Sequence, residues 1–375
     1  MSEPCSPVFH PPASLRWGAA ICAVAVAAGL YFGGALPVAV GLFTPPWDLL
    51  AHASVFAVVG ATAGMASGSR GWRLLLCSLS GALLVGSMDE LHQLHLPGRN
   101  AGLEDLLADL VGGSIGALWL VLAYRWADGV AWPQRWEALL KKIQRVPVDA
   151  DDASLLRQLS QPTQPTVLAF VNAHAMNSAA RDADFFDSLI SADTLLRDGA
   201  GMSVLFKMLG IAPGQNLNGT DLIPRLIRQF HGRPIALLGT QEPYLTRAAG
   251  AVQDDLDHDK RAAKAHGFMG QNYYLALVRA HESELIVLGM GMPRQEEVAC
   301  ALRAALTQPC LIVCGGAIID FLGGKTPRAP HWMRRFGLEW VYRLVQEPVR
   351  LFRRYVLGNP VFLLRALRLR WAPQH

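Results

Sequence analysis

The hydrophobic positions divide the chain into two halves of different character. Four apolar stretches lie at roughly 17–35, 49–66, 72–88 and 104–124, each close to the twenty or so residues that a helix needs to cross a bilayer. Charged residues return beyond position 126 at the density of an ordinary soluble protein. The pattern therefore predicts an all-α, four-helix transmembrane domain over residues 1–126, followed by a soluble half.

In the second half, short apolar runs alternate with helical patterns. Runs of four to seven apolar residues between helices are typical of a parallel sheet that is covered on both faces. The pattern predicts a linker over 127–164 and an α/β Rossmann-like parallel sheet over 165–335. The expected strands are 167–171, 194–196, 235–239, 285–288 and 311–314, and the expected helices are 177–190, 201–209, 220–230, 243–252 and 294–305.

Basic residues are concentrated near the C-terminus. Between Lys325 and Arg370 the chain carries eleven Lys or Arg residues against two acids, interspersed with Trp, Phe and Leu. This composition favours an anionic surface such as lipid headgroups, and it predicts a basic amphipathic membrane-associating tail over 336–375. The alternative is a packed C-terminal helix with a solvated arginine face. Nucleic acid is disfavoured as a partner because the chain has no DNA- or RNA-binding motif.

Basic residues also predict how the chain is oriented in the membrane. Arg16 precedes the first apolar segment, Arg70 and Arg73 lie between the second and third, and a basic run follows the fourth. The positive-inside rule then places both termini and the soluble half in the cytoplasm, as expected for a multi-pass protein of the bacterial inner (cytoplasmic) membrane. The six cysteines form no Cys-x-x-Cys pair, which agrees with reduced thiols in that compartment.

Ionisable residues within the apolar half are costly at membrane depth, so they indicate function or mutual pairing. They form the patterns Asp48-x-x-x-His52, Asp89-Glu90-x-x-Gln93, Pro97-Gly98-Arg99 and Asp105-x-x-x-Asp109. These patterns resemble the VanZ-like family over about residues 45–120. Two interpretations stay open: a helical anchor with internal ion pairs such as Arg99 with Asp105, or a domain that handles a lipid or the acceptor.

Polar and glycine-rich segments follow the predicted strands, where an open α/β sheet places its ligand crevice. Glycine turns and helix N-termini at these points suit a phosphate. No Walker or Gly-x-Gly-x-x-Gly motif is present, which argues against a P-loop NTPase or a dinucleotide dehydrogenase. The segments are Asn172-Ala173-His174, Asp198-Gly199-Ala200-Gly201, Asn216-Leu217-Asn218-Gly219-Thr220-Asp221, Gly239-Thr240, Gly289 through Glu296, and Gly315-Gly316 with Asp320.

In combination, these motifs resemble the WecG/TagA/CpsF family, glycosyltransferase family 26. The chain carries Asp-Gly-x-Gly, Asn-Gly-Thr-Asp, Gly-Met-x-x-Pro-x-Gln-Glu and the block from Arg328 to Leu344, in the family's order over about 165–360. The resemblance implies an inverting glycosyltransferase that moves an N-acetylmannosamine-type or related sugar. The donor would be a UDP-sugar and the acceptor a sugar linked to undecaprenyl (polyprenyl) diphosphate.

Inversion needs a general base for the acceptor hydroxyl and stabilisation of the departing diphosphate. The resemblance implies Asp198 as the base, with Asn172 beside it. Asp198 could instead be an N-cap, Glu296 a plain helix-start residue, and the arginines solvated charges. The implied donor or nucleotide residues are Gly199, Gly201, Gly239, Gly289, Gln295, Glu296 and Asp320, and the implied acceptor or diphosphate residues are His174, Asn216, Asn218, Asp221, Arg328, Arg334 and Arg335.

The chain departs from the family pattern at Phe170, where many members have Thr, and at His174, where they have an acid. Asn216 also stands where some members carry Arg. Donor or acceptor chemistry could therefore differ, and His174 could compete as base. No Asp-x-Asp motif ends a strand, so a reaction without metal ion or other cofactor is expected.

Two other functions remain open on the sequence. One is an inactive scaffold or regulator that binds nucleotide sugars within a polysaccharide assembly complex, and the other makes the membrane half the active part. A homo-oligomer and polysaccharide assembly proteins are further partners that the sequence leaves open.

Overall fold

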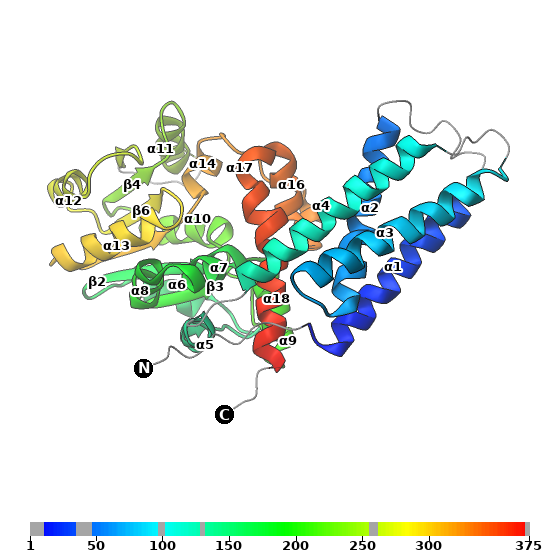
Figure 1. Ribbon diagram of the computed structural model, residues 1–375. Coiled ribbons are helices and arrows are strands. Elements are labelled where there is room, and N and C mark those ends of the chain that lie inside the picture. Colours follow the sequence, from blue (N-terminus) through cyan, green and yellow to red (C-terminus); the bar gives the residue numbers. More distant parts are fainter. Residues whose placement is uncertain (1–10, 35–46, 97–101, 128–131, 255–261, 372–375) are drawn as a thin grey trace. The chain divides into compact units, whose positions relative to one another are not determined.

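The computed structural model describes residues 11–34, 47–96, 102–127, 132–254 and 262–371, apart from the side chains of His331 and Arg335. Pro97-Gly98-Arg99 lies outside these ranges, so the expected Arg99–Asp105 pair does too. The chain forms two compact units, Met1–Asp128 and Gly129–His375. Each unit is described by itself (Figure 1).

The described residues of the N-terminal unit form four long helices, as the apolar stretches predict: α1 (Ala13–Gly34), α2 (Trp47–Ser67), α3 (Trp72–Gln93) and α4 (Leu103–Ala127). All four are long and apolar enough to cross a membrane. Helices α2 and α4 approach closely through glycines. A Cβ atom at Gly60 would lie 2.6 Å from the carbonyl oxygen of Gly113, and one at Gly116 would overlap the backbone of Ala57. Small residues of this kind let backbones pack without a hydrophobic driving force in lipid.

Polar and ionisable side chains of this unit make contacts with one another. Nδ1 of His52 lies 2.9 Å from Oδ1 of the fully buried Asp109, which joins α2 to α4. Gln93 donates from Nε2 to Oδ2 of Asp89 at 2.9 Å within α3. The two contacts are of the kind that the interpretation of a helical anchor with internal pairs expects.

The C-terminal unit is an α/β fold, as predicted. Its first elements include α5 and β1, which lie in the segment expected as a linker. The elements are α5 (Trp132–Lys142), β1 (Ile143–Gln144), α6 (Ala153–Ser160), β2 (Pro165–Val171), α7 (Ala173–Arg181), α8 (Ala183–Ser191), β3 (Thr194–Arg197), α9 (Gly199–Met208), α10 (Gly219–Gln229), β4 (Ile235–Gly239), α11 (Tyr244–Asp254), β5 (Ala263–Ala265), α12 (Gln271–Ala280), β6 (Leu285–Gly289), α13 (Arg294–Ala305), β7 (Cys310–Cys314), α14 (Ile318–Leu322), α15 (His331–Arg335), α16 (Glu339–Gln346), α17 (Pro348–Phe352), the π-helix η2 (Arg353–Leu357) and α18 (Gly358–Trp371).

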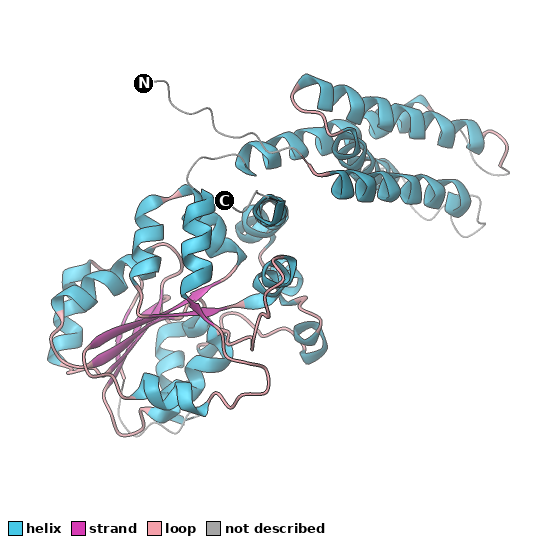
Figure 2. Ribbon diagram, turned by 90° about the horizontal axis from the view of Figure 1, so that it is seen from below, coloured by secondary structure: helices cyan, strands magenta, loops and turns pink. Residues whose placement is uncertain are grey.

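All seven strands run parallel in the order β1-β3-β2-β7-β6-β4-β5, with helices on both faces (Figure 2). The five strands that the apolar runs predict are present, and the short edge strands β1 and β5 lie outside those runs. The predicted helix 177–190 is two helices, because Asp182 ends α7 and caps α8 by accepting a hydrogen bond from the backbone of Phe185 at 3.0 Å.

Alternate residues of each central strand enter two separate cores. In β2, Val167, Ala169 and Val171 face one core, which α5, α7, α8, α9, α12, α13 and α18 cover. Leu168 and Phe170 face the other, which α6, α10, α11 and α14 cover. The two-residue side-chain period of a strand produces this division.

The end of the chain differs in part from the predicted interfacial tail. Phe362 and Leu364 are buried, and Phe362 belongs to the core beneath α18. Nη1 of Arg365, also buried, donates to Oδ1 of Asn177 at 2.9 Å. The expectation that Phe362 and Leu364 face a membrane is therefore wrong, because one side of α18 packs against α7 and α9. Helices α15–α17 and the turn after α15 do expose apolar side chains, including Trp332, Phe336, Val345, Val349 and Phe352; we call these five the tail surface.

Candidate active site

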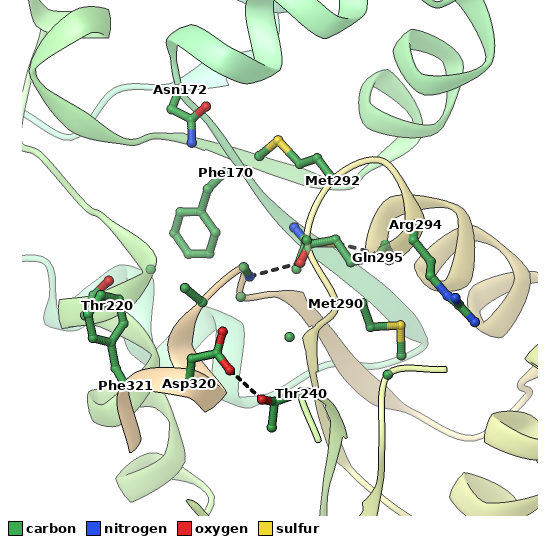
Figure 3. A pocket seen from close by; sticks show the side chains of 18 of the residues that line it. Phe170, Asn172, Thr220, Thr240, Met290, Met292, Arg294, Gln295, Asp320 and Phe321 are labelled. Atoms are coloured by element: carbon green, nitrogen blue, oxygen red, sulfur yellow. Dashed lines mark hydrogen bonds between the residues drawn. The ribbon is translucent and has the colours of Figure 1, made fainter. Parts of the chain in front are cut away.

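A pocket of about 330 Å³ lies at the carboxyl ends of the central strands, where the sheet changes the direction of its winding. Strand β3 lies on one side of β2, and β7, β6 and β4 follow on the other. The loops after these strands line the pocket together with α14 and the tail helices α16, α17 and η2. Figure 3 shows Asn172 and Thr240 toward opposite ends of it, with Gln295 between them.

Asp198 follows β3 and lines the pocket. Its backbone occupies the N-cap position of α9, yet its side chain makes no capping hydrogen bond. Instead, Oδ2 accepts a hydrogen bond from Nδ2 of Asn172 at 3.4 Å. Burial raises the pKa of Asp198, and the Asn172 bond and the charges of Arg354 and Arg343 oppose this rise. The side chain of Asp198 therefore faces the pocket and does not cap the helix, in contrast to the N-cap alternative.

The helix cap of α7 sets the orientation of Asn172. Its Oδ1 accepts a hydrogen bond from the backbone N–H of Ala175 at 3.0 Å. The amide nitrogen is therefore free of the cap and donates to Asp198. Figure 3 shows that this amide points into the pocket. Because Asn172 ends β2 and Asp198 ends the neighbouring strand, the parallel register brings the two side chains together.

Hydrogen bonds from outside the pocket stabilise the turn that contains Asp198. The backbone N–H of Gly199, at φ +84°, donates to Oδ1 of Asn216 at 2.9 Å. Arg197 is buried and donates to the carbonyl oxygens of Pro213 and Gly214, both at 2.7 Å. Asn216 and Gly199 therefore support the turn that carries Asp198 and do not line the pocket themselves.

Four basic side chains of the C-terminal region line the pocket. Lys325 follows α14, Arg343 and Arg350 come from α16 and α17, and Arg354 comes from η2. The Nε atoms of Arg343 and Arg354 are buried and have no hydrogen-bond partner among the described residues. Burial lowers the pKa of Arg354, while Asp198 raises it. Guanidinium groups beside a carboxylate, each with a buried Nε that has no partner among the described residues, suit a doubly charged anion such as a diphosphate.

Gln295 lies on the floor of the pocket. Its Oε1 accepts from the backbone N–H of Gly316 at 3.0 Å (Figure 3), and its Nε2 donates to Oε1 of Glu296 at 2.8 Å. Glu296 lies behind it, only 2% exposed, and does not line the pocket. Burial raises the pKa of Glu296 to about 7, and the Gln295 bond opposes the rise. Glu296 therefore supports Gln295 and does not face the pocket.

Asp320 lines the far side of the pocket with Gly289. Its Oδ1 accepts a hydrogen bond from Oγ1 of Thr240 (Figure 3) and lies 3.3 Å from Nζ of Lys325. Gly239 is not in the pocket lining. A Cβ atom there would overlap the carbonyl of Gly289, so this glycine lets the ends of β4 and β6 approach closely.

The remaining sequence candidates lie outside the pocket lining. Asn218 caps α10 and also donates to Asp221 at 2.8 Å, and Asp221 pairs with Arg328. Burial raises the pKa of Asp221, but the bonds from Asn218 and Arg328 outweigh it, so the pKa is lowered. The other candidates in this group are Gly201, His174 and Arg334, and the side chain of Arg335 is not described.

His174 follows Asn172 closely but does not line the pocket. Burial, with the charges of Arg354 and Arg181, lowers the pKa of His174 to about 4. The imidazole is therefore neutral near pH 7.

Several pocket residues were missed by reasoning from the sequence. Arg343, Arg350 and Arg354 were noticed only as part of a basic tail, and Thr240 only as a residue after a strand. Phe170 was noticed as a departure from the family pattern, and it contributes an aromatic ring to the pocket (Figure 3). Phe268 had no sequence signal, because its loop follows the unpredicted strand β5.

An open parallel sheet with a polar pocket at its switch point defines the class: an α/β protein that binds its ligand at the carboxyl edge. The model of the family described as "Glycosyl transferase WecG/TagA/CpsF family" matches residues 141–375. The chain belongs to this family and is a glycosyltransferase. The match does not extend to the N-terminal helices, whose resemblance to VanZ-like proteins stays a prediction.

Similar proteins from two organisms carry the same name, N-acetylglucosaminyldiphosphoundecaprenol N-acetyl-beta-D-mannosaminyltransferase. The Bacillus subtilis (strain 168) protein is 27% identical over 206 residues, which cover 54% of this chain and 79% of that protein. The Staphylococcus aureus (strain MW2) protein is 22% identical over 236 residues, which cover 60% of this chain and 91% of that protein.

Proposed function

We propose that this protein is an inverting glycosyltransferase that moves a sugar from a UDP-sugar to an acceptor linked to undecaprenyl diphosphate. The names of the similar proteins support the acceptor class and an N-acetylmannosamine-type or related sugar. The product would serve the synthesis of a cell-surface or exopolysaccharide.

The observation that carries the proposal is the placement of Asp198 in the pocket with a raised pKa. A general base works best when its pKa lies near the working pH, and burial moves this carboxylate in that direction. Asp198 would take the proton of the acceptor hydroxyl while the hydroxyl oxygen attacks the anomeric carbon. The bond from that carbon to the diphosphate breaks on the opposite face, so the configuration inverts and UDP leaves.

The basic side chains would stabilise the leaving group. Arg343, Arg350 and Arg354 line the same pocket as Asp198, and the charges of Arg343 and Arg354 act on it. As the bond breaks, negative charge accumulates on the diphosphate, and preorganised cations lower the energy of that state. Because these side chains can supply the positive charge, we propose that transfer needs no metal ion.

The tail surface would bring this pocket to the lipid. Its exposed Val345 and Val349 lie on α16 and α17, the helices that also carry Arg343 and Arg350 into the pocket. Exposed apolar side chains among arginines are typical of interfacial helices. We propose that the tail surface contacts the cytoplasmic leaflet of the inner membrane and that the four N-terminal helices span it, with both termini in the cytoplasm.

The test is transfer by the purified full chain in detergent, assayed with UDP-sugars and an undecaprenyl-diphosphate-linked N-acetylglucosamine acceptor, with and without a chelator. Replacing Asp198 by Asn keeps the shape of the side chain but removes the base. The rate should fall by about 10²- to 10⁴-fold, and UDP should still bind. Asp187→Asn, which changes an exposed carboxylate on α8, is the matched control and should retain the rate.

Undiminished turnover by Asp198→Asn would refute the assignment of the base. If the wild-type chain binds UDP but transfers no sugar from any donor, the inactive scaffold becomes the better explanation.

A further inference from the structure

A loop beside the pocket exposes an aromatic ring. Phe268 follows β5 and is 70% exposed, yet it lines the pocket together with Gly267 and Thr240. An exposed phenyl ring forgoes the favourable free energy that burial of a large apolar side chain provides. An exposed ring at the mouth of a polar pocket is a candidate surface for a flat ligand.

Hydrogen bonds hold the loop in place on both sides of Phe268. The N–H of Gly267 donates to the carbonyl oxygen of Thr240 at 2.9 Å, and the N–H of Met269 donates to the hydroxyl of Tyr274 at 3.0 Å. That hydroxyl donates in turn to the carbonyl oxygen of His266 at 2.9 Å. Nη2 of Arg294 donates to the carbonyl oxygen of Met269 at 2.8 Å. The backbone that carries the ring is therefore held in place, which reduces the cost of ordering the loop on binding.

The order of the strands places Phe268 far from Asp198 along the edge of the sheet. From β3, which carries Asp198, to β4, which carries Thr240, there are four strand spacings of about 4.8 Å, or roughly 19 Å. Strand β5, with Phe268 after it, is one spacing further. A nucleotide sugar with its anomeric carbon at Asp198 and its diphosphate at the arginines would extend its nucleoside toward this end.

We propose that Phe268 is the stacking platform for the nucleobase of the donor. This inference rests on the proposed function and adds the position of the base. Aromatic side chains stack on the faces of bases, whose edges are left for other contacts. Asp320, whose Oδ1 is engaged by Thr240 and Lys325, lines the same pocket and would lie near the ribose.

The test is the affinity of the full chain in detergent for UDP, measured by calorimetry, with inorganic pyrophosphate as a second probe that has no base. Phe268→Ala should weaken UDP binding by about 10- to 100-fold, because stacking on an aromatic residue contributes at this level. It should leave the affinity for pyrophosphate unchanged. Phe268→Trp should bind UDP at least as well as the wild type.

Tyr273→Ala is the matched control. This aromatic side chain of α12 is 47% exposed, five residues away, and does not line the pocket. Its removal should leave UDP affinity unchanged. In transfer assays, Phe268→Ala should raise KM for the donor with little effect on kcat, as expected for a contact made equally in the ground and transition states.

Each failure has its own signature. Equal UDP affinity in the wild type and Phe268→Ala would overturn the stacking assignment while the proposed transferase stands. Parallel losses for UDP and pyrophosphate would also overturn it, since the effect would then be structural. A wild-type chain that binds neither UDP nor UDP-sugars would overturn the proposed donor and the stacking assignment together.

Discussion

Replacing Glu296 by Gln should stabilise the protein at alkaline pH and much less at acidic pH. Glu296 is 2% exposed, its Oε1 accepts from Gln295, and its Oε2 is buried with no partner among the described residues. Burial raises its pKa from 4.5 to about 7. Glutamine has nearly the same shape and an amide that keeps an acceptor for Gln295, but it does not ionise.

The sign and size follow from linkage. The unfolded chain loses the Glu296 proton near pH 4.5 and the folded chain near pH 7, so the free energy of unfolding falls as the pH rises between these values. A difference of this size corresponds to about 3 kcal/mol at 1.36 kcal/mol per unit. The variant lacks this loss. Its stability relative to the wild type should therefore increase by most of that amount between pH 5 and pH 8.

The assay is the thermal midpoint of both proteins in detergent across this pH range. For a unit of roughly 250 residues, this free energy corresponds to an added shift of about 5 to 10 °C in favour of the variant at pH 8. Glu297→Gln, at the neighbouring exposed position of α13, is the control and should shift little. The raised pKa of Glu296 would be refuted if the difference between the thermal midpoints of Glu296→Gln and the wild type stayed constant from pH 5 to pH 8.

Two further predictions concern the base and the membrane helices. Asp198 must be ionised to act as a base, and its pKa is raised above the ordinary 3.8. We therefore expect kcat/KM to fall as the pH drops through a value above 3.8. A pH–rate profile with no acidic limb above that value would contradict this. Gly116→Ala should lower the thermal midpoint in detergent, because the new Cβ would overlap the backbone of Ala57, whereas Gly18→Ala, with open space around it, should not. Equal midpoints for these two variants would show that α2 and α4 do not pack through Gly116.

Local patterns predicted much of the fold. The apolar stretches identified all four long N-terminal helices, and the apolar runs identified the five central strands, because a buried parallel strand is apolar along its whole length. The edge strands β1 and β5 are two and three residues long, too short for a recognisable run. The division at Asp182 depended on one capping side chain.

The candidate site was predicted in part. Asn172, Asp198, Gly289, Gln295 and Asp320 lie after predicted strands, and all of them line the pocket. The motifs did not distinguish residues that line the pocket from residues that support it from outside, such as Asn216 and Glu296. A motif contains both kinds of residue, because a loop needs its supporting hydrogen bonds as much as its contacts with a ligand.

By itself, the sequence determined the two-part organisation, the parallel α/β class and the carboxyl ends of the strands as the place of the site, since these follow from periodicity and composition. Only the tertiary structure decided the strand order, and with it the neighbours of Asp198. It also brought Arg343 and Arg354 into the pocket and buried Phe362 in the core. The physical reason is that such contacts join residues from different elements of the chain, whose meeting depends on how whole elements pack and leaves no local signal.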